Sequence, residues 1–261
     1  VVTYLRFSEM RLLGKFTRCQ FTPVAAQNMR FSSAMFGSSF RSNDSRTSEA
    51  GGKRILHLNL SHGDKSLVSE GAKTFLSNLK FQHKVHELKM WKDPLEVQYN
   101  LSHAMAKMKL LMNESTKEDE ELFNPVLRQA EMINDMDIVL ISTPMWNYSI
   151  PYPLKQYIDT IVQPGINFCD GDQSSLGDLR GRHLVVFSSA GALYGEDSHV
   201  KDFLNPYLGQ VFRLMGFERQ EIVFIQGTSL RSHEELSSFT QERALSAALR
   251  LNNDICDKIS D

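Results

Sequence analysis

The sequence predicts an α/β protein whose core is a doubly wound, five-stranded parallel sheet with helices on both faces. Two observations support this fold class. Short apolar runs rich in β-branched residues alternate with longer segments in which apolar residues recur at helical spacing. The clearest of these runs, Ile138–Ile141, is continuously apolar. Such a run is typical of a strand buried on both faces.

Length and composition exclude several classes of protein. The chain has 261 residues, 41% of them apolar, and a formal charge of -2. This near-neutral balance gives no electrostatic argument for a nucleic-acid partner or a membrane surface. No run approaches the ~18 consecutive apolar residues of a membrane-spanning helix. The three cysteines, Cys19, Cys169 and Cys256, form no metal-binding spacing. We therefore expect neither a disulfide framework nor a metal site. We also expect the protein to work in a reducing compartment.

The first 52 residues differ from the rest and are set apart as a disordered leader. Up to Arg46 they carry seven basic residues against two acidic ones, Glu9 and Asp44, together with many serines. This composition is typical of a transit peptide for a mitochondrion or plastid. The alternative is an ordinary disordered tail on a cytoplasmic protein. In either case, residues 53–261 form the predicted folded domain.

The predicted elements alternate along this domain. Helical spacing after the first strand indicates one helix, and the segment 95–134 contains two more, in which Met105, Met108 and Met112 are expected to face the core. One common doubly wound arrangement has the strand order 2-1-3-4-5, with its ligand at the switch between strands one and three. The five predicted strands are Lys53–Leu60, Lys84–Leu88, the run from Ile138 to Ile141, His183–Ser188 and Glu221–Gln226. Three more helices are predicted. One follows Pro153, and a second spans Val200–Met215. The third runs from Ser232 to Ile255, and Ser232 and Glu235 form a capping box at its start.

The turn after the first strand indicates a binding site for a single phosphate. A P-loop would need glycines where Asn59 and Asp64 stand, and no GxGxxG pattern follows the strand. What remains is Ser61-x-Gly63-x-x-Ser66, which leads straight into a helix. Free backbone N–H groups and two hydroxyls at a helix start suit a terminal phosphate. The alternative is an ordinary turn in which Ser66 caps the helix.

The loop after the third strand carries the most specific motif. Its residues 143–151, Thr-Pro-Met-Trp-Asn-Tyr-Ser-Ile-Pro, resemble the PMYNFxxP motif of the flavodoxin-like family of FMN-dependent NADH-azoreductases and NAD(P)H:quinone oxidoreductases. Trp146 stands where the family usually has tyrosine, which preserves a large flat face. The alternative is a turn whose aromatic side chains fill the core. The resemblance implies that the isoalloxazine ring of FMN is wrapped by Pro144, Met145, Trp146, Asn147 and Tyr148.

Three further segments extend the resemblance, which covers about Lys53 to Gly227. Residues 176–181, Leu-Gly-Asp-Leu-Arg-Gly, resemble the family's G-L-x-G-K lead into the fourth strand. Residues 164–168, Pro-Gly-Ile-Asn-Phe, resemble a family segment whose phenylalanine, here Phe168, lies near the substrate pocket. Residues 188–194 resemble the family's S-R-G-G-x-[YH] loop, with Ala190 in place of its arginine and Ala192 in place of its second glycine. The resemblance implies cofactor contacts from Ser189, Ala190, Gly191 and Tyr194.

The resemblance implies a flavin oxidoreductase. FMN would be tightly bound and would carry two electrons from NADH or NADPH to quinone or azo acceptors in a ping-pong cycle. The chemistry belongs to the cofactor, so no catalytic side chain is assigned. Family members are homodimers with the site at the subunit boundary, and the same is expected here. Two alternatives remain: a flavodoxin-type electron carrier, and a flavin-free regulatory domain of the same fold. The near-neutral charge and the helical segment before the third strand favour the enzyme.

Overall fold

The computed structural model describes residues 52–63, 65–93, 95–164, 166–168, 179–195 and 199–256. Within them, five parallel strands form one sheet in the order β2-β1-β3-β4-β5. The predicted fold class and strand order are therefore confirmed. The strands are β1 (Lys53–Asn59), β2 (His83–Lys89), β3 (Ile138–Pro144), β4 (His183–Ala190) and β5 (Arg219–Gln226).

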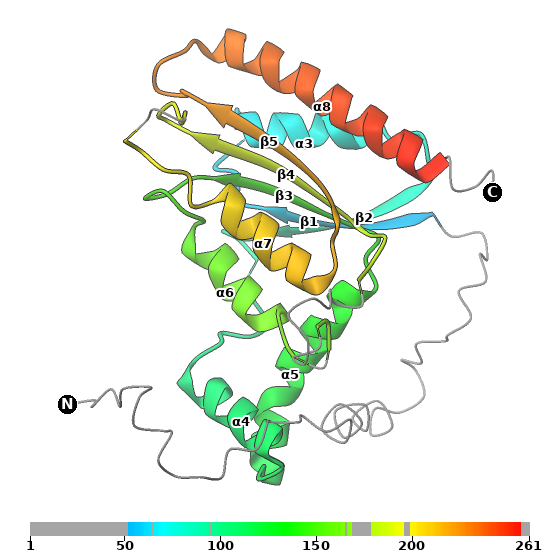
Figure 1. The fold of residues 1–261 in the computed structure, drawn as a ribbon, viewed down its shortest axis with the longest axis vertical. Coiled ribbons are helices and arrows are strands. Elements are labelled where there is room, and N and C mark those ends of the chain that lie inside the picture. The colour runs from blue at the N-terminus through cyan, green and yellow to red at the C-terminus, as the bar shows by residue number, and fades with distance from the viewer. Residues whose placement is uncertain are drawn as a thin grey trace, which may run out of the picture.

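Helices cover both faces of this sheet (Figure 1). On one face lie α3 and α8, and on the other lie α6, α7 and the end of α5. The hairpin of α4 and α5 projects away from the sheet, and α4 lies at its far end (Figure 1). The helices are α3 (Leu67–Ser77), α4 (Leu101–Met112), α5 (Lys117–Asn134), α6 (Tyr152–Ile161), α7 (Asn205–Met215) and α8 (His233–Cys256).

The central strand β3 explains why the sheet needs both layers. Ile138 and Leu140 pack into the core under α3 and α8, whereas Val139 and Ile141 pack into the core under α6 and α7. All four side chains are fully buried. Burying one such side chain stabilises the fold by about 1.5–3 kcal/mol. A strand with apolar residues on both faces gains this stabilisation from each of the two helix layers. The continuous apolar run thus fixes β3 at the centre of the sheet.

The prediction that the methionines of α4 face the core is wrong. Met105, Met108 and Met112 are about half exposed, and Leu101 on the same side of the helix is 76% exposed. On this helix the residue that is buried is Ala106, which belongs to a small core with Val97 and residues of α5. Helical spacing shows which residues share a side of a helix, but not which side is covered.

Two predicted helix starts are corrected in detail. Helix α7 begins at Asn205 and not at Val200, because the Asp202 carboxylate accepts the N–H groups of Leu204 and Asn205 at 2.8 and 3.0 Å. At the start of α8, only half of the predicted capping box is formed. The Ser232 hydroxyl accepts the N–H of Glu235 at 3.2 Å, while the Glu235 carboxylate pairs with the neighbouring Arg231.

Candidate functional site

The candidate site lies at the edge of the sheet where the parallel strands end. The loops after β1, β3 and β4 meet there because these strands are neighbours in the sheet. Backbone hydrogen bonds join them directly. The N–H of Leu60 donates to the carbonyl of Ser142 at 2.7 Å, and the N–H of Met145 donates to the carbonyl of Ser189 at 2.7 Å. Three of the segments singled out in the sequence are thus brought together at the position where doubly wound sheets bind ligands.

The loop after β3, residues 145–149, is called the ring loop here. Trp146 and Ser149 exchange two backbone hydrogen bonds of 3.0 Å, and the residues between them have positive φ angles of 47° (Asn147) and 69° (Tyr148). This geometry is that of a type I′ turn. The left-handed region costs a tyrosine roughly 1–2 kcal/mol, so surrounding contacts must hold the turn. One of them is the N–H of Phe203, which donates to the carbonyl of Tyr148 at 3.1 Å.

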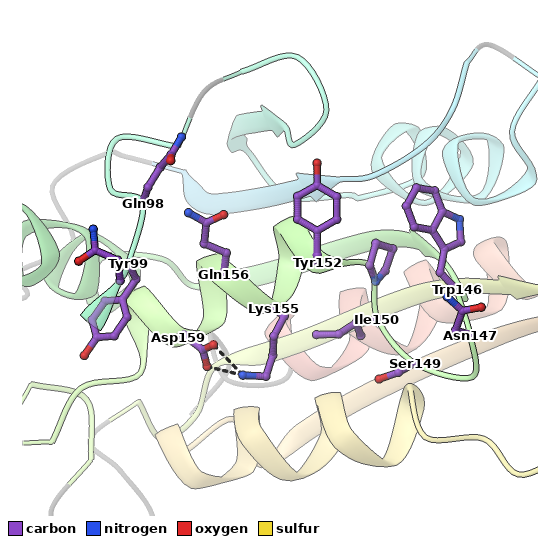
Figure 2. A pocket seen from close by; sticks show the side chains of 12 residues that line it. Gln98, Tyr99, Trp146, Asn147, Ser149, Ile150, Tyr152, Lys155, Gln156 and Asp159 are labelled. Carbon is purple, nitrogen blue, oxygen red and sulfur yellow. Dashed lines mark hydrogen bonds and ion pairs between the residues drawn. The ribbon is translucent and has the colours of Figure 1, made fainter. Parts of the chain in front are cut away.

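The turn directs the aromatic side chains of the ring loop outward. Trp146 is 39% exposed and Tyr148 is 52% exposed, whereas Met145 packs against the core. The alternative that these aromatic rings fill the core therefore does not hold. Figure 2 shows Trp146 and Asn147 beyond the start of α6, on the side where Tyr152 begins the helix. The ring loop presents a flat apolar face and a side-chain amide on a fixed backbone.

Trp146 belongs to an aromatic stack formed with His62, Trp91 and Tyr152. The ring centroids of Trp146 lie 4.8 Å from Trp91 and 5.3 Å from His62, and Tyr152 lies 5.9 Å from Trp91. The indole N–H of Trp91 donates to the carbonyl of Leu60 at 2.8 Å. His62 follows β1, Trp91 follows β2, and Trp146 and Tyr152 both follow β3. The sequence analysis missed Trp91, although Trp91 follows β2 much as Trp146 follows β3.

The loop after β1, residues 61–66, is called the serine loop here; Asp64 lies outside the described residues. Ser66 occupies the N-cap position of α3, yet its hydroxyl makes no capping hydrogen bond. The alternative that Ser66 serves as a side-chain cap is therefore not supported. Ser61 and Ser66 are both partly exposed. Among the described residues the Ser66 hydroxyl caps nothing, and a hydroxyl beside the first N–H groups of a helix forms a site suited to an anion such as phosphate.

The loop after β4 closes the site on its other side. The carbonyl groups of Ala190, Gly191 and Ala192 accept N–H groups from residues 227–229. A Cβ atom at Gly191 would lie 2.7 Å from the Ser229 Oγ atom, so a larger residue there would require the Ser229 side chain to rotate away. Ala190 is 5% exposed, so it offers the site little beyond its backbone.

Tyr194, at the end of this loop, faces the ring loop. Partial burial raises the pKa of its hydroxyl, and the nearby Tyr148 and Asp202 raise it further. The Tyr194 ring lies 5.4 Å from that of Phe224 in β5, and its backbone N–H donates to the side chain of Gln226 at 2.7 Å. These contacts hold Tyr194 against the end of β5.

An open cavity of about 790 Å³ adjoins the ring loop on the side of α6 (Figure 2). Its walls come from residues 98–100, which precede α4, from the ring loop and from α6. No residue of the loop after β4 lines it. Within it, Lys155 and Asp159 form an ion pair at 2.6 Å along α6. Trp146 and Asn147 therefore border this cavity.

Phe168 lies apart from the other predicted site residues. It follows α6, and α6 runs from the ring loop toward the opposite edge of the sheet, where β4 begins (Figure 1). An isolated bridge pairs Phe168 with Pro164, and the side chain is partly buried. Within one chain, the structure does not bring Phe168 to the ring loop. The residues that follow it, 169–178, include most of the segment that leads into β4 and are not described.

The described residues include neither a metal-binding cluster nor a membrane-spanning helix. No group of three or more His, Cys, Asp or Glu side chains there could hold a metal ion. No helix in that part of the chain has the length and apolar character needed to cross a membrane.

The fold and the three loops define a flavodoxin-like protein with its ligand site where the strands end. A family model described as having a flavodoxin-like fold matches residues 53–249, and the chain belongs to this family. An FMN-dependent NADH:quinone oxidoreductase of Desulfotalea psychrophila is 28% identical over 207 residues, which cover 76% of this chain and 97% of the relative. The FMN-dependent NADH:quinone oxidoreductase 1 of Bradyrhizobium diazoefficiens is 30% identical over 190 residues, covering 67% and 88%.

A solved structure has the same fold. The FMN-dependent NADH-azoreductase of Bacillus anthracis, crystallised with FMN, superposes with a TM-score of 0.68 at 23% identity. The match covers 77% of this chain and all of the azoreductase chain. The resemblance inferred from the motif after β3 is thus confirmed by relatives that extend over nearly the whole predicted domain.

Proposed function

We propose that this chain is an FMN-dependent NADH:quinone oxidoreductase that also accepts azo compounds. The observation that carries the proposal is the rigid, outward-facing ring loop, which lies beside an uncommitted serine loop. A flat apolar ring and a terminal phosphate are the two ends of FMN, and these two loops match them. The names of the relatives from Desulfotalea and Bradyrhizobium support the same cofactor, donor and acceptor.

The residues present fit FMN at both ends. Ser61, Ser66 and the first N–H groups of α3 would hold the phosphate. Pro144 to Tyr148 would hold one side of the isoalloxazine ring, and Ser189, Ala190, Gly191 and Tyr194 the other. When bound, FMN supplies the two-electron chemistry that links a nicotinamide donor to the acceptor.

The contribution of the protein is orientation and electrostatics. The N–H groups of Gly191 and Ala192 have no backbone hydrogen-bond partner among the described residues. Together with the Asn147 amide they can donate to the polar edge of the ring, where negative charge accumulates on reduction. Fixed donors at such an edge stabilise developing charge without reorganisation. Because Ala190 replaces the family arginine, these groups would do so without help from a cationic side chain at that position.

The first experiment tests the cofactor. Purified protein should retain, or take up, FMN with the visible absorption of a bound flavin. NADH should then bleach that absorption in a stopped-flow measurement. Protein that binds no flavin even with added FMN would favour the flavin-free regulatory domain. Protein that binds FMN but is not reduced by NADH would favour the electron carrier.

The second experiment tests the reaction order. With a quinone or an azo dye as acceptor, double-reciprocal plots should give parallel lines, as expected for a ping-pong cycle. Intersecting lines would contradict it. Comparing NADH with NADPH in the same assay determines the preferred donor.

We further propose that the active form is a homodimer that covers the exposed side of α4. Leu101, Met105, Met108 and Met112 form an apolar stripe there, and Asn100 at the start of α4 also lines the cavity beside the ring loop. The stripe therefore begins next to a residue of the cavity wall. A second copy seated on them would also offer a route by which Phe168, remote from the ring loop in its own chain, could approach a site.

Light scattering after size-exclusion chromatography tests this assembly. The native chain should measure as a dimer, and the double variant Met105→Lys/Met108→Lys should measure as a monomer. Leu249→Lys, a 54% exposed leucine on α8, is the control and should remain dimeric. A double variant that stays dimeric would place the interface elsewhere.

For residues 1–52 we propose the role of an organelle transit peptide. The family match begins at residue 53, which supports a boundary at that point. A fluorescent protein fused behind residues 1–52 should enter a mitochondrion or plastid. Uniform cytoplasmic fluorescence would indicate an ordinary tail.

A further inference from the structure

The base of the serine loop is held by an asparagine whose side-chain oxygen and nitrogen both form hydrogen bonds. Asn59 is the last residue of β1. Its Oδ1 atom accepts the backbone N–H of Ser61 at 2.9 Å, and its Nδ2 group donates to Oε1 of Glu87 at 2.7 Å. Glu87 belongs to the neighbouring strand β2. The side chain of Asn59 therefore links the edge strand to the first residue of the serine loop.

Glu87 determines which way the Asn59 amide faces. An ionised carboxylate only accepts hydrogen bonds, so the NH₂ group must point to Glu87 and the carbonyl oxygen to Ser61. With the opposite orientation, Nδ2 would face the Ser61 N–H, and both hydrogen bonds would be lost. The bond to Ser61 is a side-chain-to-backbone bond across two residues, which turns the chain as it leaves the strand. Glu87 thereby sets the direction in which the serine loop leaves the sheet.

A buried histidine extends this contact to β3. His57 Nε2 lies 2.9 Å from the Ser142 hydroxyl, and its Nδ1 lies 3.5 Å from Glu87 Oε1. Ser142 is fully buried and is close to the end of β3, just before the ring loop. The side chains of Asn59, Glu87, His57 and Ser142 thus form one polar network beneath the serine loop.

We propose that Asn59 and Glu87 are positioning residues that set the serine loop for the 5′-phosphate and thereby make the protein select FMN over riboflavin. This inference rests on the proposed function, because it assigns the phosphate to the serine loop. Neither residue needs to touch the flavin. They act by fixing the N–H of Ser61, which leaves the hydroxyls of Ser61 and Ser66 and the start of α3 oriented toward one point.

The test is the affinity for FMN and for riboflavin, which lacks the phosphate, measured by quenching of flavin fluorescence. Asn59→Ala and Glu87→Ala should each weaken FMN binding about tenfold, the effect of losing one hydrogen bond that orders the loop. Riboflavin binding should change less than about twofold in the same variants, because the ring loop is untouched. Glu87→Gln retains an acceptor oxygen for Asn59 and should keep the native preference for FMN.

A matched control is available at the far end of α3. Asn252 also uses both ends of its amide, accepting the N–H of Lys80 at 2.8 Å and donating to the carbonyl of Asn78 at 3.0 Å. Asn252→Ala should lower the melting temperature without altering the ratio of the two affinities.

The outcomes separate the two proposals. If the native protein binds neither flavin, the proposed function fails, and this inference fails with it. If the native protein prefers FMN but Asn59→Ala and Glu87→Ala keep the same preference, only the inference fails. A parallel fall of both affinities would indicate a general structural role and would also overturn it. Glu87 is partly exposed, so its variants remain informative even if Asn59→Ala does not fold.

Discussion

The serine loop and the ring loop follow neighbouring strands, but they are built in opposite ways. The ring loop closes on itself through two backbone hydrogen bonds, and its two central residues, Asn147 and Tyr148, are held at positive φ. The serine loop is anchored at its base by Asn59 and by one bond from the N–H of Ser66 to the carbonyl of Gly63, while the Ser66 hydroxyl makes no capping bond. The ring loop is thus a preformed surface, whereas the serine loop offers polar groups that a ligand can complete.

Because of this difference, the contribution of the phosphate to ligand affinity can be separated from the contribution of the flavin ring. Changes to the serine loop should act on the phosphate alone, and changes to the ring loop should act on any flavin. The polar network beneath the serine loop also makes that region sensitive to pH, because it contains a buried histidine.

The largest expected effect concerns His57 at the base of the serine loop. Burial lowers its pKa from 6.5 to about 4, although the nearby Glu87 raises it in part. Between these two values the unfolded chain binds a proton that the folded chain does not, so acidification destabilises the fold. From pH 7.5 to pH 4 the loss attributable to His57 is on the order of 3 kcal/mol.

Urea unfolding at several pH values measures this loss. The variant His57→Gln, which has no titrating ring, should lose about 3 kcal/mol less than the native chain over the same range. Equal losses in the two proteins would mean that His57 is protonated in the folded state, and the network beneath the serine loop would need another description.

The next effect concerns the serine loop itself. The double variant Ser61→Ala/Ser66→Ala removes two hydroxyl donors to a charged group, each worth about 1.5 kcal/mol or more. FMN affinity should therefore fall about 100-fold, while riboflavin affinity should stay within about twofold. Isothermal titration with both ligands checks this. A fall in riboflavin affinity of similar size would show that the loop binds the ring and not the phosphate.

A smaller effect is expected at Trp146 in the ring loop. Trp146→Ala removes one stacking face, which is worth about 1 kcal/mol or more, so the affinities for FMN and riboflavin should both fall about fivefold to tenfold. Trp146→Tyr restores the family residue and should bind both flavins nearly as well as the native chain. Unchanged affinities in Trp146→Ala would place the ring of Trp146 entirely against Trp91 and away from the ligand.

The fold and the meeting of the serine loop with the ring loop could be predicted from the sequence, for physical reasons. Continuous apolar runs identify the central strands, which are buried on both faces, and five strands alternating with helices leave few topologies. Once the order 2-1-3-4-5 is assumed, the meeting of the serine loop with the ring loop follows from the parallel strands. The motif around Trp146 then indicated the ligand.

Three features could not be obtained in the same way. The side of α4 that carries Met105 was assigned to the core because periodicity does not show which side a neighbour covers. The contact of Trp91 with Trp146 depends on how two loops of irregular backbone fold over the sheet edge. The bond between Asn59 and Glu87 joins residues of two strands whose register is set only when the sheet forms. Contacts of this kind depend on tertiary structure and leave no local pattern.

The smallest expected effect tests whether the ring loop is preformed. Asn147 has a φ angle of 47°. Asparagine tolerates this conformation and glycine adopts it freely, whereas it costs alanine roughly 1 kcal/mol. Asn147→Ala should therefore lower the free energy of unfolding by about 1 kcal/mol, whereas Asn147→Gly should change it by a few tenths. Both variants lose the same side-chain amide, so the difference between them isolates the backbone. Equal stabilities in chemical denaturation would mean that the turn is not held at positive φ without a ligand, and the contrast with the serine loop would disappear.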